Sequence, residues 1–87
     1  MLKTEPSLPS SGSQDYLGLM GRRVRQVRAR RGMSRRILAG ASGVSERYLA
    51  QLEAGKGNAS IMVLHAIATA MHVPIDDLVD PREDQPI

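Results

Sequence analysis

One short run of this sequence, residues 43–55, holds the side chains with the most specific chemistry. Ser45 is a favoured helix N-cap, and a helix that begins after it turns Leu49 and Leu52, three positions apart, to one side. The residues left largely on the outer side are Glu46, Arg47, Tyr48, Ala50 and Gln51. Arginine, glutamine and glutamate carry the donors and acceptors that pair with base edges in the DNA major groove. The run therefore predicts a short helix that reads duplex DNA.

Three of these side chains also have an interpretation that needs no base contact. Glu46 stabilises the positive end of the helix dipole, because it lies in the first turn. Gln51 follows Arg47 by four positions, so the two share one ridge, although glutamine also occurs on faces that meet only water. Tyr48 either packs at the domain edge, donates to a phosphate or touches a thymine methyl group. The residue types alone leave these alternatives open.

A second short helix is expected immediately before the first. Ser34 is a suitable N-cap for a helix that begins at Arg35, and Gly43 allows the sharp turn with positive φ that must follow. The inner side of this helix is expected to carry Ile37, Leu38 and Ala41. Two helices joined through such a turn form a helix-turn-helix, in which the second helix enters the groove and the first crosses the sugar-phosphate backbone.

Positive charge is concentrated around this pair of helices. Residues 22–56 carry ten basic residues and two acidic ones, and residues 22–36 alone hold eight arginines and no acid. Residues 76–84, by contrast, hold five acidic residues and one arginine. A charge run is usually a solvated face, but a solvated face normally mixes signs. A run of one sign suits the neutralisation of DNA phosphates, so double-stranded DNA is the expected partner.

Composition excludes several other classes of function. The 87 residues contain no cysteine, which removes disulfides, thiolate metal sites and a cysteine nucleophile. His65 and His72 have no acidic or cysteine neighbour that completes a metal or acid–base site, so we expect no enzyme, no catalytic residue, no metal and no cofactor in this chain. No signal peptide and no apolar run of about 18 residues are present, which predicts a cytoplasmic protein with no membrane partner.

The rest of the chain supplies the elements that position the helix pair. Residues 1–14 are rich in Ser and Pro and lack periodicity, so they predict a disordered arm, and residues 80–87 predict a linker or tail. Residues 15–79 between them predict one domain. Neither phenylalanine nor tryptophan occurs, so its core must be aliphatic.

Apolar residues at helical spacing complete an all-α domain. The first helix is expected from Asp15 to Arg31, and a later helix from Ile61 until Val73 and Pro74 end it. The inward stripe of the first helix is Leu17, Met20, Val24 and Val27, and that of the later helix is Ile61, Leu64, Ile67, Ala68 and Met71. With short helices at 35–41 and 46–54 and a last turn at 75–79, no strand is predicted.

Several linked motifs resemble the helix-turn-helix domain of the phage repressor and Cro family. They are Arg-x-x-Arg-Gly-Met-Ser at 28–34, Leu-Ala at 38–39, Gly-Val-Ser at 43–45, Leu-x-x-Leu-Glu-x-Gly-Lys at 49–56, Ser-Ile-x-x-Leu at 60–64 and Ile-Ala-x-Ala-Met-x-Val-Pro at 67–74. The resemblance covers about residues 22–78, with a family core at about 24–78 and the motif at 35–54. It implies a compact five-helix bundle that regulates transcription, as a repressor, by binding DNA as a dimer.

A narrower resemblance lies in residues 42–58, which are similar to bacterial regulators of aromatic-acid catabolism that respond to benzoyl-CoA. These regulators join the DNA-binding domain to a C-terminal shikimate-kinase-like domain. The resemblance implies a role at a catabolic operon and an acyl-CoA effector bound outside this chain. The alternative is an antitoxin-like module that binds both DNA and another protein.

The family pattern also assigns roles to individual residues. It implies base contacts by Glu46, Arg47 and Gln51, and phosphate or edge contacts by Arg35, Ser45, Tyr48, Lys56 and Asn58. It implies a structural ion pair between Arg28 and Glu53. Arg35 departs from the family, because many relatives have glutamine there, and His72 stands where glycine is usual. For the dimer surface we expect Ile75, Leu78 and Val79.

Overall fold

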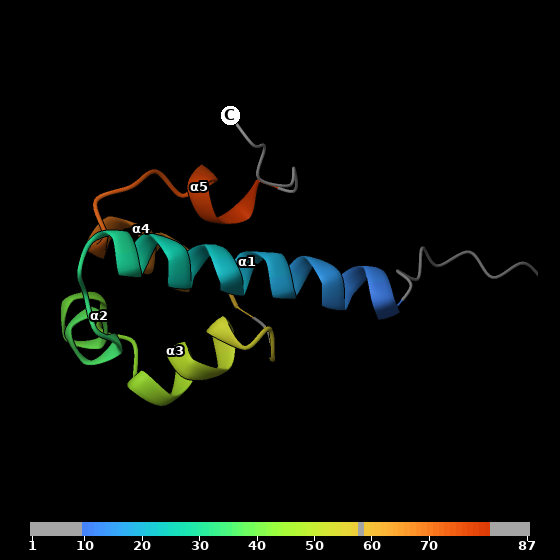
Figure 1. The fold of residues 1–87 in the computed structure, drawn as a ribbon, viewed down its shortest axis with the longest axis horizontal. Coiled ribbons are helices and arrows are strands. Elements are labelled where there is room, and N and C mark those ends of the chain that lie inside the picture. Colours follow the sequence, from blue (N-terminus) through green and yellow to red (C-terminus); the bar gives the residue numbers. More distant parts are fainter. Residues whose placement is uncertain (1–9, 58, 81–87) are drawn as a thin grey trace, which may run out of the picture.

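The computed structural model describes residues 10–57 and 59–80, and within them it contains five α-helices and no strand. The helices are α1 (Ser10–Arg30), α2 (Arg35–Ser42), α3 (Glu46–Glu53), α4 (Ile61–Ala70) and α5 (Asp76–Val79). Figure 1 shows α1 as the long axis of the domain, with α2 and α3 on one side of it and α5 on the other. The predicted all-α, five-helix fold is confirmed.

The first helix is longer than its sequence pattern indicated. It begins at Ser10, ahead of the expected start at Asp15, so residues 10–14 belong to α1 and not to an arm. Once a helix is nucleated, each added residue forms another hydrogen bond, which allows a weakly helical serine-rich segment to extend it. The remainder of the predicted arm, residues 1–9, and the predicted tail at 81–87 lie outside the described residues.

The core is aliphatic and draws on all five helices. Its buried members are Met20, Val24, Val27, Leu38, Leu49, Leu52, Leu64, Ile67, Ala68, Met71 and Leu78. Burying each of the larger side chains contributes about 1.5–3 kcal/mol, so helices too short to be stable alone are held by packing. The core thus fixes the inner faces of α2 and α3 and leaves their other faces to water.

Four apolar residues lie differently from our expectation. In α2 only Leu38 is buried, whereas Ile37 is 56% exposed and Ala41 is exposed. Successive helix residues are about 100° apart, so positions 37 and 41 share a ridge that no neighbouring helix covers. Ile61, the first residue of α4, is 61% exposed for the same reason. Leu78 is fully buried, so it cannot contribute to the dimer surface predicted for it.

The helix ends follow the local sequence closely. Ser34, Ser45 and Ser60 each cap a helix, and their hydroxyl oxygens accept a backbone N–H three residues later at 3.0–3.1 Å. Such a cap contributes about 0.5–2 kcal/mol. Gly43, after α2, has a φ of 79°, a left-handed conformation that favours glycine. His72 adopts the same region with a φ of 61°, where its relatives are expected to carry glycine.

Candidate nucleic-acid interface

Helix α3 separates its residues cleanly between the core and the surface. Leu49 and Leu52 are buried, and the three side chains predicted to contact bases, Glu46, Arg47 and Gln51, are all exposed. Arg47 and Gln51 are one helical turn apart and so lie on one ridge. The structure therefore brings the three candidate base-reading side chains to the surface of one helix whose other side is anchored in the core.

The turn between α2 and α3 fixes the angle at which this surface is presented. The N–H of Gly43 donates to the carbonyl oxygen of Ala39 at 2.9 Å, which closes the end of α2. The Ser42 hydroxyl donates to the carbonyl oxygen of Leu38 at 2.7 Å and accepts the N–H of Val44 at 3.3 Å. The turn is thus closed by its own hydrogen bonds, and α3 begins directly after it with Ser45 as its N-cap.

The residues predicted to contact phosphate are distributed around α3. Arg35 and Ser45 are exposed at the starts of α2 and α3, and Lys56 is exposed just after α3. Tyr48 is half-buried and packs against the core, which favours the domain-edge interpretation of this residue. Asn58 lies outside the described residues. Both ends of α3 therefore present exposed basic or hydroxyl groups.

The loop after α3 is held close to α1. Gly55 has a φ of 77°, and a Cβ atom placed on it would lie 3.1 Å from the Cα atom of Gly18. The N–H of Lys56 donates to the carbonyl oxygen of Gln51 at 2.9 Å. The left-handed glycine and this hydrogen bond end α3 and set the position of the Lys56 backbone beside it.

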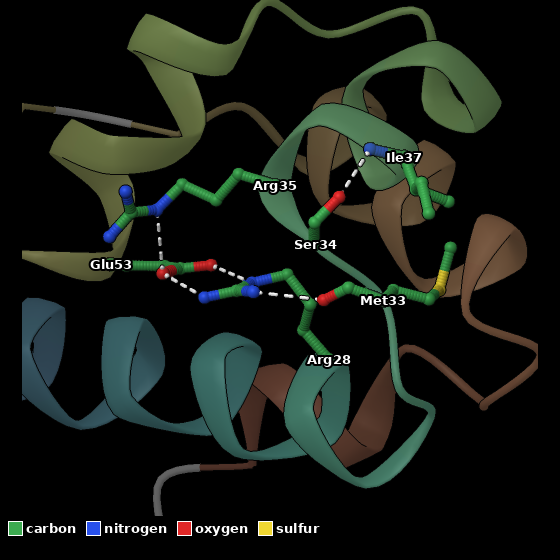
Figure 2. Close-up of polar contacts among 6 residues, drawn as sticks. All are labelled: Arg28, Met33, Ser34, Arg35, Ile37 and Glu53. Carbon is green, nitrogen blue, oxygen red and sulfur yellow. Dashed lines mark hydrogen bonds and ion pairs between the residues drawn. The ribbon is translucent and has the colours of Figure 1, made fainter.

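An ion-pair cluster joins three helices behind this surface (Figure 2). Arg28 of α1 donates twice to the carboxylate of Glu53, from Nε to Oε2 at 2.7 Å and from Nη2 to Oε1 at 2.9 Å. Its Nη1 donates to the carbonyl oxygen of Met33 at 2.9 Å. Arg35 of α2 donates from Nε to Oε1 of the same carboxylate at 3.1 Å. The expected pair of Arg28 and Glu53 is present, and Arg35 joins it.

The cluster keeps the Glu53 carboxylate ionised although its side chain is only 2% exposed. Burial by itself raises the pKa of Glu53. The hydrogen bonds from Arg28 and Arg35 and the positive charges of these two residues lower the pKa by a larger amount, so the net pKa is below the ordinary value. The hydrogen bond to Glu53 likewise raises the pKa of Arg28. A buried charge is thus matched by two arginines.

Not every arginine of the basic run faces solvent. Arg23 is only 6% exposed and donates from Nη1 to the carbonyl oxygen of Asp80. The Tyr16 hydroxyl donates to the carbonyl oxygen of the preceding residue, Val79. These contacts tie the end of α5 to α1. Arg23 and Arg28 therefore serve the fold, and the charge available to phosphate is smaller than the sequence count indicated.

Sequence reasoning missed the partnership of Arg35 with Glu53 and the burial of Arg23. Helical spacing relates neither Arg35 to Glu53 nor Arg23 to its partner Asp80. Arg35 and Glu53 lie at opposite ends of the helix-turn-helix, because Arg35 begins α2 and Glu53 ends α3. Among the residues that the structure describes, no group of three or more His, Cys, Asp or Glu side chains is placed to hold a metal ion. In the same residues no helix combines the length and the hydropathy needed to cross a bilayer.

Comparison with known proteins identifies the fold and its class. A family model described as a helix-turn-helix domain matches residues 19–81. The crystal structure of the restriction-modification controller protein C.AhdI from Aeromonas hydrophila superposes with a TM-score of 0.70 at 32% identity, covering 71% of this chain and 94% of that one.

Curated relatives point the same way. The uncharacterized HTH-type transcriptional regulator y4dJ of Sinorhizobium fredii is 31% identical over 72 residues, which cover 83% of this chain and 94% of that protein. The HTH-type regulator SutR of Escherichia coli is 36% identical over 60 residues, 69% of this chain but 34% of SutR. Both relatives are named as HTH-type transcriptional regulators, which is the class of protein expected for this chain. The chain belongs to the helix-turn-helix domain family of transcriptional regulators.

Proposed function

We propose that this domain binds duplex DNA sequence-specifically, with α3 in the major groove and the start of α2 on the backbone. One observation carries the proposal: Glu46, Arg47 and Gln51, whose side chains match base edges, are all exposed on a helix whose opposite face is anchored in the core. Membership of the helix-turn-helix family supports the same docking.

One copy of the motif covers half of a binding site. We therefore propose that two copies bind a palindrome whose half-sites are about one helical turn of DNA, or a multiple of it, apart. Since Leu78 is buried, we do not place the contact between the copies on the surface first expected. Sedimentation of the domain with and without a palindromic duplex tests this stoichiometry, and a complex of one copy per palindrome at saturation contradicts it.

Binding is expected to weaken steeply with salt. If about 6–8 phosphates are neutralised per bound dimer, the logarithm of the association constant falls against the logarithm of salt concentration with a slope of about −5 to −7. Fluorescence anisotropy with a labelled duplex in a series of NaCl concentrations measures this slope. A flat response contradicts the proposal, because DNA binding by a basic surface releases counterions.

Two substitutions separate the reading of bases from attraction to the backbone. Arg47→Ala should cost about 1–3 kcal/mol on the preferred site, selected from a random pool of duplexes, and almost nothing on random DNA. Lys56→Ala should weaken both duplexes by a similar factor and reduce the salt slope by about 1. If both variants lose affinity equally on both duplexes, Arg47 contacts phosphate and Gln51 becomes the leading base-reading residue.

We further propose that the regulator is a repressor at an operon for aromatic-acid catabolism, with an acyl-CoA effector bound outside this chain. The similarity of residues 42–58 to benzoyl-CoA-responsive regulators supports this proposal. Footprinting on DNA upstream of its own gene, with the full-length protein, should show protection that benzoyl-CoA abolishes. Protection unchanged by benzoyl-CoA contradicts the proposed effector.

A further inference from the structure

We infer that Arg35 is a phosphate clamp whose orientation is set by Glu53, so that the carboxylate that joins α1 to α3 also aims a side chain at the DNA backbone. The inference rests on the proposed function and deepens it, because it names a positioning residue and a fixed geometry for one phosphate contact. Four features of the structure support it.

The first feature is the way in which Arg35 is held. Its Nε–H donates to Oε1 of Glu53 at 3.1 Å, while 44% of its side chain remains exposed. In Figure 2 the dashed line to the carboxylate runs from Nε of Arg35, and no interaction is drawn from its two terminal nitrogens. A guanidinium has five N–H donors, so four remain on the terminal nitrogens for an anion. This fork matches the oxygens of a phosphate in a bidentate contact.

The second feature is that the acceptor cannot rotate. The Glu53 carboxylate receives two hydrogen bonds from Arg28, one on each oxygen, and its side chain is only 2% exposed. Arg28 is itself held by the carbonyl oxygen of Met33. Arg35 is therefore attached to a fixed point of the fold. A side chain that is already oriented loses less conformational freedom when it binds a ligand.

The third feature is the place of Arg35 in the motif. It is the first residue of α2, directly after the cap Ser34, and the first turn of α2 contains no acidic residue. The start of a helix carries a partial positive charge and backbone N–H groups that favour a phosphate. In the helix-turn-helix docking geometry the first helix of the motif crosses the DNA backbone. The fork thus lies where a phosphate is expected.

The fourth feature is the balance of charge. Two arginines share one carboxylate, so the cluster keeps a net positive charge although Glu53 is ionised. Because Arg28 is largely covered and Arg35 is partly exposed, the surplus charge is presented at the Arg35 side. Arg36, the next residue, is also exposed but has no hydrogen bond or ion pair to another part of the chain that the structure describes, which makes it a matched control.

The test uses a random-sequence duplex, because a phosphate contact does not depend on sequence. Anisotropy titrations in several salt concentrations should show that Arg35→Ala binds about tenfold more weakly and that its salt slope falls by about 1. Arg35→Lys keeps the positive charge, but a single ammonium group cannot bond the Glu53 carboxylate and at the same time offer two aligned donors to a phosphate. It should retain the salt slope and still lose affinity about threefold or more, whereas Arg36→Lys should bind like the wild type.

Glu53→Gln provides the second arm. In that background a further Arg35→Lys change should cost little affinity, because the orienting charge is already lost. If Glu53→Gln does not fold by circular dichroism, the comparison of Arg35→Lys with Arg36→Lys decides the matter alone. Wild-type affinity for Arg35→Lys, or equal losses for both lysine variants, overturns the inference. A wild-type domain that binds no duplex overturns the proposed function as well, which distinguishes the two failures.

Discussion

Glu53→Ala is expected to lower the melting temperature of this domain by roughly 12 °C or more. The substitution leaves Arg28, whose side chain is only 15% exposed, without the carboxylate that accepts two of its hydrogen bonds. Breaking a buried ion pair in this way costs about 3–5 kcal/mol, and the remaining access of Arg28 to water places the loss near the lower end. In a domain of this size 1 kcal/mol corresponds to roughly 4–8 °C.

Thermal unfolding followed by circular dichroism measures this effect. Glu46→Ala is the matched control, because it removes an exposed glutamate from the same helix and should cost only about 0.3–1 kcal/mol. Increased salt should not restore the stability of Glu53→Ala, since the effect comes from a covered charge. Equal melting curves for the two variants show that the cluster does not hold the fold together.

The same carboxylate makes stability depend on pH in a defined direction. The pKa of Glu53 is lowered in the folded protein from its ordinary value of 4.5, so its contribution is fully present above that value and is lost as pH falls through the folded pKa. The wild type should therefore lose stability in acid more steeply than Glu53→Ala. Unfolding of both proteins at a series of acidic pH values measures this difference. If the stability of the two proteins falls equally as the pH is lowered, the expectation is contradicted.

Gly21→Ala is expected to destabilise the domain by about 1–3 kcal/mol or more, although alanine favours helices. Gly21 lies in α1 against the end of α3, and a Cβ atom added there would meet the carbonyl oxygens of Leu52 and Glu53 at 2.3 and 2.9 Å. Backbone atoms cannot move aside as a flexible side chain does. The two helices must separate, which also disturbs the contact of Arg28 with Glu53.

Gly40→Ala is the matched control for this substitution. Gly40 lies within α2, is exposed, and an added Cβ atom would meet nothing within 4 Å. Alanine should therefore stabilise the domain by about 0.5–1 kcal/mol, since glycine is entropically unfavourable in a helix. Urea denaturation of both variants measures the difference. A Gly21→Ala protein as stable as Gly40→Ala contradicts the close approach of α1 and α3.

The sequence by itself determined the features that depend on a few neighbouring residues. The caps at Ser34, Ser45 and Ser60 and the left-handed turn at Gly43 arise within three or four positions, so their residue types predict them. The exposure of Glu46, Arg47 and Gln51 follows from the burial of leucines at helical spacing on the other side of α3. Their contacts with bases stay a prediction.

Only the tertiary structure decided which apolar faces are covered and which charges are paired. Ile37 is apolar at a plausible inward position but exposed, and Leu78 is taken into the core, because neighbouring helices cover one ridge and leave another open. The bond between Arg35 and Glu53 and the close approach at Gly21 join segments with no periodic relation in the sequence. Such contacts depend on how α1, α2 and α3 pack against one another. Local sequence patterns carry no information about how closely helices far apart in the sequence approach.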